Sequence, residues 1–260
     1  MSSKGYDFET LRAERTGAVL KITIDHPRSE LNAVDERLHA DLTALFATLR
    51  REDDARAVVL TGRGKAFSAG GDFKFFPRVL AEPGGLEHLR RDAKQLIWDL
   101  LDVEVPIVAA VNGPAIGLGA SIALLCDTIF MADTATIADP HVRVGLVAGD
   151  GGAAIWPLAV GPALAKQYLM TGDPLTAEDA ARLGLVNRVV PAADVVAEAM
   201  RFAERLAAGA PLAVRYTKLS VNKLVKDALN VAFDVSTALE IVTFKSDDHQ
   251  EALAAIREKR

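Results

Sequence analysis

Two glycine-rich turns in the sequence expose backbone N–H groups at places where a reacting group could bind. The first turn lies within residues 62–74, GRGKAFSAGGDFK, directly after the apolar run of residues 56–60. The second lies within residues 111–121, VNGPAIGLGAS, after the apolar run of residues 106–111. Each pattern predicts a buried strand, a glycine turn and the start of a helix. Two converging N–H groups stabilise an enolate or a tetrahedral oxyanion by roughly 3–4 kcal/mol per donor. Glycine spacing alone is also typical of an ordinary strand–turn–helix connection.

A histidine and an aspartate nine residues apart form the second candidate group. Imidazole titrates near neutral pH, so His141 could act as an acid or as a base. Asp150 lies in the sequence GDGG, where a turn could bring its carboxylate to the ring as a His–Asp pair. Other interpretations stay open, because His141 could bind backbone in a loop and Asp150 could cap a helix over residues 151–157.

The composition is that of an ordinary globular protein. The chain has 260 residues, half of them hydrophobic, and its formal net charge of −5 gives no support for nucleic-acid binding. No apolar run approaches the roughly 20 residues of a membrane helix, and no secretory signal is recognisable. The single cysteine, Cys126, cannot form an intrachain disulfide, which fits a cytoplasmic location. The five histidines are scattered without zinc-ligand spacing, so no metal site is expected.

Strand and helix patterns alternate until about residue 190, and helical patterns alone follow. This order predicts an α/β core over residues 1–195 and a helical region over residues 196–260. Within the core, Asp35 is expected to cap a helix over residues 35–51, and Asp72 to begin a helix or helical turn. Prolines and glycines between residues 76 and 85 predict a mobile loop there.

Six segments in order along nearly the whole chain resemble the crotonase family, the enoyl-CoA hydratase/isomerase superfamily. They are AFSAGGDFK (66–74), VNGPAIGLGASIALLCD (111–127), DPHVRVGLVAGDGG (139–152), LTAEDAARLGLVNRVVP (175–191), APLAVRYTK (210–218) and SDDHQEALAAIREKR (246–260). The resemblance implies a crotonase-like spiral of repeated ββα units with a C-terminal helical trimerisation region. It also implies a homotrimer or a hexamer of two trimers, coenzyme A as part of the substrate, no permanently bound cofactor and no metal. The implied oxyanion donors are the backbone N–H groups of Gly71 and Leu118.

The chain differs from the family's hydratases at the two positions of their catalytic glutamates. One glutamate activates water and the other delivers a proton to the α-carbon, and these positions match Ser121 and His141 here. A serine hydroxyl cannot hold a proton as a carboxylate base does. The resemblance therefore implies a lyase of fatty acid metabolism in which His141 and Asp150 transfer protons and Ser121 is a positioning group.

Two alternatives to this function stay open. Relatives that cleave β-diketones rely on histidine and aspartate, so the chain could hydrolyse the C–C bond of a 1,3-dicarbonyl compound without coenzyme A. A relative that has lost the glutamates could also bind acyl-CoA without catalysis.

The resemblance also implicates residues that would hold the substrate. Residues 26–35, HPRSELNAVD, resemble the family's adenine-binding segment, and a lysine near the C-terminus would reach the neighbouring subunit's coenzyme A. The expected substrate-binding residues are Arg28, Leu31, Ala69, Phe73, Trp156 and Lys259. The plain alternatives are a surface turn for Arg28, a solvated helix end for Lys259, and core packing for Trp156 and Phe73.

Overall fold

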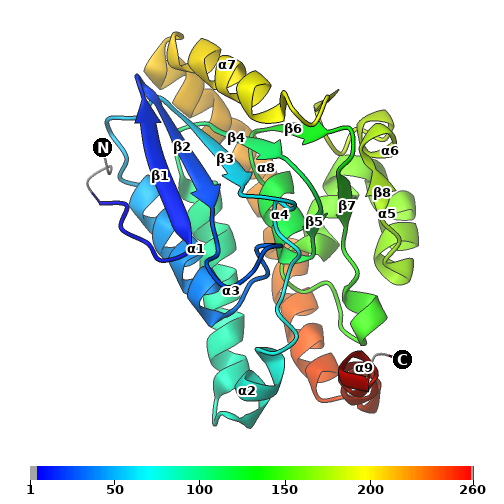
Figure 1. The fold of residues 1–260 in the computed structure, drawn as a ribbon. Coiled ribbons are helices and arrows are strands. Elements are labelled where there is room, and N and C mark those ends of the chain that lie inside the picture. The colour runs from blue at the N-terminus through cyan, green and yellow to red at the C-terminus, as the bar shows by residue number, and fades with distance from the viewer. Residues whose placement is uncertain (1–4, 259) are drawn as a thin grey trace.

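The computed structural model describes residues 5–258 and 260. A twisted six-stranded sheet crosses this part of the chain in the order β1-β2-β3-β4-β6-β9 (Figure 1). The strands are β1 (Leu11–Thr16), β2 (Val19–Ile24), β3 (Ala57–Gly62), β4 (Ile107–Val111), β6 (Thr128–Ala132) and β9 (Arg188–Val190). β1 and β2 are antiparallel, whereas the later neighbours are parallel. β3 and β4 are buried along their whole length, which explains their continuous apolar sequences.

A smaller sheet carries the second glycine turn. β5 (Ala115–Ile116) pairs in parallel with β7 (Thr136–Ala138), and β7 pairs antiparallel with β8 (Leu175–Thr176). A bridge between Ser68 and Ala115 joins the first glycine turn to this sheet, and a second bridge joins Gly71 to Val34. The two turns, which are far apart in the sequence, therefore lie side by side.

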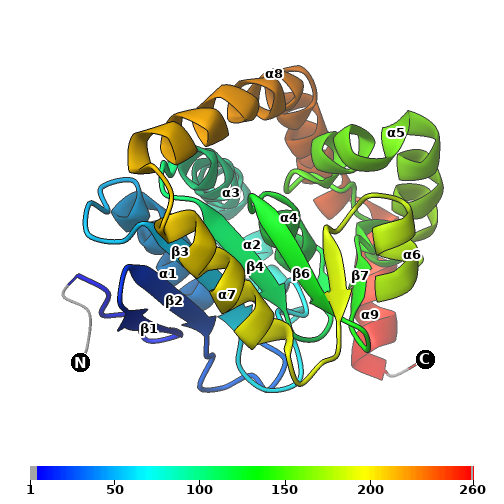
Figure 2. The same cartoon turned by 90° about the horizontal axis from the view of Figure 1, so that it is seen from above.

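Helices cover both faces of the main sheet. α7 (Val195–Ala207) lies across one face, and α1 (Glu36–Leu49) and α3 (Gly85–Asp102) lie on the other side (Figures 1 and 2). The Asp35 carboxylate accepts a hydrogen bond from the Leu38 N–H at 2.9 Å, so the predicted cap of α1 is confirmed. The remaining helices of the core are α4 (Leu118–Leu124), α5 (Gly152–Thr171) and α6 (Ala177–Arg182). The predicted α/β class is confirmed.

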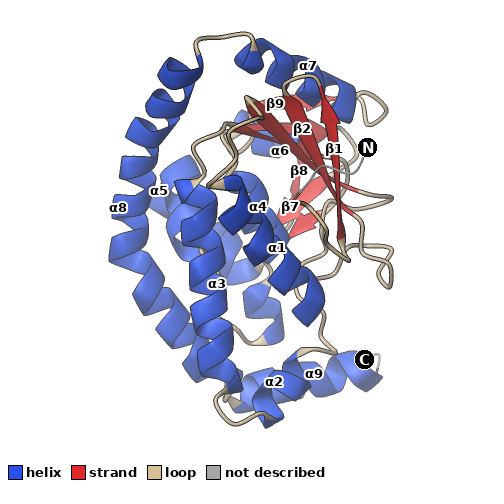
Figure 3. Cartoon of the chain, turned by 90° about the vertical axis from the view of Figure 1, so that its left-hand side faces the viewer, coloured by secondary structure: helices blue, strands red, loops and turns tan. Residues whose placement is uncertain are grey.

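The C-terminal helices lie along one side of the molecule. α8 (Pro211–Phe244) passes α5 and α3, and α9 (Asp247–Glu258) follows it beside α2 (Phe76–Ala81), as Figure 3 shows. No helix of the described residues is long and apolar enough to span a bilayer. Because α7 packs on the sheet and α8 leaves it, the helical region divides into two differently placed parts; the domain boundary at residue 195 stays a prediction.

The segment after the first glycine turn differs from its prediction. The prediction of a mobile loop between residues 76 and 85 was wrong, because α2 occupies residues 76–81. Pro77 lies in the first turn of α2, where its missing N–H leaves no helical hydrogen bond unmade. Asp72 begins a turn and not α2, in agreement with the second of its two predictions: its carbonyl accepts from the Phe75 N–H at 2.8 Å and its carboxylate from the Lys74 N–H at 2.9 Å.

Candidate active site

The two glycine turns pack directly on one another. The Ser68 N–H donates to the Pro114 carbonyl at 3.1 Å, and the Ile116 N–H donates to the Ser68 carbonyl at 2.9 Å. A side chain at Gly70 would lie 2.7 Å from the Ile116 carbonyl oxygen, so only glycine allows this approach. Gly71 and Leu118 both line one cavity. Among the hydrogen bonds of residues 5–258 and 260, neither the Gly71 N–H nor the Leu118 N–H is a donor.

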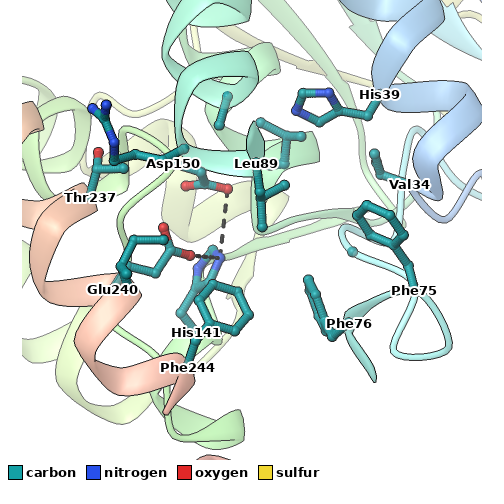
Figure 4. Close-up of a pocket in the computed structure, with 15 residues that line it drawn as sticks. Val34, His39, Phe75, Phe76, Leu89, His141, Asp150, Thr237, Glu240 and Phe244 are labelled. Carbon is teal, nitrogen blue, oxygen red and sulfur yellow. Dashed lines mark ion pairs between the residues drawn. The ribbon is translucent and has the colours of Figure 1, made fainter. Parts of the chain in front are cut away.

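This cavity, of about 80 Å³, is mostly apolar. Figure 4 shows the acidic side chains at one end and His39, Val34 and Phe75 at the other. Its lining residues are Val34, His39, Gly71, Phe75, Phe76, Leu89, Arg90, Ala93, Leu118, His141, Asp150, Thr237, Glu240, Ile241 and Phe244. A more open hollow of about 240 Å³ adjoins it and shares Gly71, Phe76 and His141. The hollow gives a substrate a route from the surface to the two turns.

His141 and Asp150 line this cavity, and Ser121 contacts Asp150. His141 begins a short 3₁₀ helix, η1 (His141–Val144), and its Nε2 lies 3.7 Å from Asp150 Oδ2 (Figure 4). The Ser121 hydroxyl donates to Asp150 Oδ1 at 3.1 Å. Because 3.7 Å exceeds a direct hydrogen bond, one water molecule could contact both Nε2 and Oδ2. The expected proximity of His141 and Asp150 is thus present, whereas their chemical roles remain predictions.

Asp139 orients the imidazole, a role that the sequence analysis did not assign. Its Oδ1 lies 2.5 Å from His141 Nδ1, and Asp139 is 2% exposed. Asp139 thus contacts the Nδ1 side of the ring, whereas Asp150 lies on the Nε2 side. A carboxylate two residues before the histidine, in the sequence DPH, was a signal that could have been used. Asp150 also does not occupy the N-cap of α5, which is Gly151.

Glu240 is the second site residue that the sequence did not indicate. It projects from α8, and its Oε1 lies 3.9 Å from His141 Nε2 (Figure 4). It lies 99 positions after His141 in the sequence, and no local motif surrounds it. Only the packing of α8 against the Asp150 turn reveals this contact.

The buried charges shift the pKa values of this cluster. Burial opposes a charge on the imidazole, but the carboxylates of Asp139 and Asp150 outweigh it and hold the pKa of His141 well above its usual value. Burial also raises the pKa of Asp150, although His141 opposes that rise. Burial raises the pKa of Glu240 to about 8. These shifts favour a protonated imidazole beside Asp139 and a neutral carboxyl group at Glu240 near neutral pH.

Three of these residues also form the group most suited to a metal ion. One ligand atom from each of Asp139, His141 and Asp150 lies within 4.8 Å of the others. However, Nδ1 of His141 is already engaged by Asp139, and a protonated imidazole neutralises the carboxylates as a cation would. The expectation of a metal-free site remains a proposal.

His39 faces the cavity from α1. It is 8% exposed, and its buried Nε2 has no hydrogen-bond partner within the described part of the chain. Burial lowers the pKa of His39, so the ring is neutral near pH 7. A neutral imidazole can donate or accept a hydrogen bond, and this nitrogen makes none within the described residues.

The expected substrate-binding residues are divided among three environments. Arg28 is exposed and pairs with Glu9 at 2.5 Å and with Asp35 at 3.4 Å. Leu31 is also exposed, and its carbonyl accepts from the Ala69 N–H at 2.9 Å. Ala69 and Phe73 line the outer hollow, beside the candidate oxyanion turn.

The other two expected residues do not reach the site in the described structure. Trp156 is fully buried and packs against Tyr168, with ring centroids 6.0 Å apart. It lines neither the cavity nor the hollow, so the core interpretation fits its position and a pocket wall does not. Lys259 lies outside the described residues.

The fold and the paired glycine turns define a crotonase-type protein, and comparison with known proteins agrees. The family profile described as enoyl-CoA hydratase/isomerase matches residues 14–260. The chain belongs to this family, and the predicted crotonase membership and fold are confirmed.

Individual relatives cover nearly the whole chain. A probable enoyl-CoA hydratase of Mycobacterium tuberculosis is 33% identical over 253 residues, which are 97% of this chain and 96% of the relative. A crystal structure of an enoyl-CoA hydratase/isomerase from Mycobacterium paratuberculosis superposes with a TM-score of 0.91 at 38% identity, covering 96% of this chain and 99% of that one. A β-diketone hydrolase from the cyanobacterium Anabaena sp. PCC 7120, bound to (S)-3-oxocyclohexyl acetic acid, superposes with a TM-score of 0.85 at 31% identity, covering 91% and 94%.

Proposed function

We propose that this enzyme of the enoyl-CoA hydratase/isomerase family acts on an acyl-CoA thioester through an enolate. The observation that carries the proposal is the position of the His141–Asp150 pair, in the same cavity wall as Gly71 and Leu118. The carbonyl oxygen of the thioester binds the N–H groups of Gly71 and Leu118. These donors stabilise the negative charge that develops there, by roughly 3–4 kcal/mol per donor in known enzymes.

The His141–Asp150 pair performs the proton transfer in this proposal. In the hydration direction a water molecule lies between His141 Nε2 and Asp150 Oδ2. Whichever of these two side chains is unprotonated removes a proton from the water. Asp139 holds the ring through Nδ1, so Nε2 faces the cavity. Ser121 fixes Asp150 through the 3.1 Å hydrogen bond to Oδ1. The reaction class is that of a lyase, with isomerisation as the variant in which water takes no part.

Hydrolysis of a 1,3-dicarbonyl compound is the second candidate. The unpartnered Nε2 of His39 favours it, because a second carbonyl oxygen would give this buried atom an acceptor. The ion pairs of Arg28 with Glu9 and Asp35 compete with a phosphate of coenzyme A. In this reaction water attacks one carbonyl, the bond to the central carbon breaks, and the electron pair forms the enolate of the other carbonyl. A ligand with a ketone and a carboxylate, such as the one bound by the Anabaena hydrolase, is the kind of product that results.

We further propose that the chain forms a trimer, or a hexamer of two trimers, through its C-terminal helices. α8 exposes a row of apolar side chains, including Leu224, Val231, Val235 and Val242. Such a row on one long helix supports burial against another copy of the chain. A neighbouring copy could then complete the coenzyme A site. We also propose that the protein is cytoplasmic.

Turnover of two substrates tests these candidates. Crotonyl-CoA hydration is followed by loss of the conjugated thioester absorbance, and cyclohexane-1,3-dione hydrolysis by loss of the absorbance of its conjugated enolate, for the wild type, His141→Ala and Asp150→Asn. The primary proposal predicts hydration of crotonyl-CoA that both substitutions reduce by about 100-fold or more. Diketone hydrolysis without hydration would favour the second candidate. Binding of acyl-CoA without turnover of either compound would favour a non-catalytic relative.

A further inference from the structure

We propose that Glu240, from the C-terminal helix α8, is the group that delivers a proton to the α-carbon of the enolate. This inference rests on the proposed function and names a second proton-transfer residue for it. Glu240 lines the cavity together with Gly71, Leu118 and His141, so its carboxyl can contact a substrate held at the two turns. The helix thereby contributes to the chemistry as well as to the surface of the protein.

The packing of α8 holds Glu240 in place. One turn before it, the Thr237 hydroxyl contacts the Gly149 carbonyl oxygen at 2.9 Å. A Cβ atom at position 149 would lie 2.2 Å from Glu240 Oε2. The Glu240 carboxyl group therefore packs directly against the backbone of Gly149, and a larger residue there would collide with it. α8 is thus fixed to the turn that carries Asp150. The separation of Glu240 from His141 is therefore set by this contact.

The surroundings of Glu240 favour a neutral carboxyl group. Leu89, Ile241 and Phe244 line the same cavity, and the Glu240 side chain is 13% exposed. Within residues 5–258 and 260, His141 is its ion-pair partner, at 3.9 Å. Burial and the nearby Asp150 and Asp139 raise the pKa of Glu240 to about 8, although the charge on His141 opposes this rise. A carboxyl group protonated at neutral pH is a suitable proton donor.

The charged groups around Glu240 come from several elements. His141 lies on η1, Asp139 lies just before it, and Asp150 precedes α5. Arg90 of α3 also lines the cavity, and its guanidinium pairs with Glu87 at 2.6 Å. The cationic His141 and the two aspartates therefore act on Glu240 in opposite directions, and burial decides the result.

The proton transfers balance over one hydration cycle. The water oxygen forms a bond to the β-carbon, the π bond between the α- and β-carbons breaks as its electrons form the enolate, and the water proton passes to the His141–Asp150 pair. The electron pair of the enolate re-forms the thioester carbonyl as the α-carbon takes the proton of Glu240. The Glu240 carboxylate then recovers a proton from His141, 3.9 Å away, through a water molecule. In C–C hydrolysis the same carboxyl protonates the enolate that departs.

The test compares Glu240→Gln with Glu251→Gln, a control at an exposed glutamate of α9. The glutamine retains the shape of the side chain but cannot transfer a proton. We expect Glu240→Gln to lower kcat at least 100-fold on the substrate that the wild type turns over, while acyl-CoA or diketone affinity changes less than threefold. The control should retain wild-type kcat. A Glu240→Gln variant that retains kcat within threefold overturns the inference.

An infrared titration gives a readout that does not depend on turnover. At pH 7 the wild type and Glu251→Gln should show a protonated carboxyl band that Glu240→Gln lacks, and the band should disappear above about pH 8. A Glu240 that is ionised at pH 6 overturns the inference, whatever the activity. Wild-type protein that turns over neither substrate refutes the proposed function, and the inference about Glu240 as donor fails with it even if the band is present.

Discussion

The charge state of His141 depends most directly on Asp139, so Asp139→Asn is the sharpest perturbation of the site. The substitution keeps the size of the side chain and removes a buried negative charge 2.5 Å from Nδ1. An opposite charge at such range raises the pKa of a histidine by about 1–3 units. Because Asp139 is 2% exposed and is the charge that most raises the pKa of His141, its removal should clearly lower that pKa. Each unit by which a pKa falls corresponds to about 1.4 kcal/mol less stabilisation of the protonated form.

The assay for this prediction is a histidine NMR titration. The chain has five histidines, and the Cε1–H signal of His141 is identified by its loss in His141→Gln. The pKa of His141 should be well above the usual value in the wild type and clearly lower in Asp139→Asn. A substitution that moves this pKa by less than about 0.3 units would refute the assignment of Asp139 as the dominant charge partner.

The free energy of unfolding should also depend on the ion pair between His141 and Asp139. The folded-state pKa of His141 is raised, so its stabilising effect is complete below the unfolded-state pKa of about 6.5 and is lost as pH rises through the folded-state pKa. Asp139→Asn should therefore lower the free energy of unfolding more at pH 6 than at pH 9.5. Urea unfolding at the two pH values measures the difference. An equal loss at both would contradict the ion pair.

Four further results are expected. Gly71→Ala places a methyl group 2.7 Å from the Phe76 ring beside the proposed oxyanion donor, and it should lower kcat about 100-fold without changing the circular dichroism spectrum. Glu240→Gln should reduce the pH dependence of the free energy of unfolding. Because the folded-state pKa of Glu240 is raised to about 8, the wild type should lose stability as the pH rises from about 4.5 to 8, by at most about 5 kcal/mol. Urea unfolding of both proteins over this pH range measures the difference. Val231→Asp, at a position 81% exposed on α8, should reduce the mass measured by light scattering from a trimer or hexamer to a smaller species. His39→Phe should raise KM for a 1,3-dicarbonyl substrate about tenfold and leave KM for crotonyl-CoA unchanged, as steady-state kinetics would show.

Much of the fold could be predicted because its signals are local. The apolar runs of β3 and β4 and the cap at Asp35 were visible as patterns of neighbouring residues. The segment after the first glycine turn could not be assigned this way, because Pro77 and the glycines that follow it are as typical of a loop as of a short helix. α2 packs against α3 and Phe76 against Phe244, and these tertiary contacts decide the outcome.

The site was predictable only where its residues are close in the sequence. His141 and Asp150 share one segment, so a turn between them could be expected. Glu240 and His39 come from distant helices, and their burial depends on packing that no local pattern encodes. Trp156 shows the opposite error: its closeness to Asp150 in the sequence suggested the pocket, but its place on α5 directs the ring into the core.

The central claim is that the proton of the α-carbon moves through Glu240 and the His141–Asp150 pair, beside an enolate held at the two glycine turns. The most direct measurement is deuterium exchange at the α-carbon of butyryl-CoA in D₂O, followed by NMR. The wild type should catalyse this exchange, and His141→Ala and Asp150→Asn should each slow it about 100-fold or more while butyryl-CoA still binds. Exchange at the wild-type rate in either variant would contradict the account.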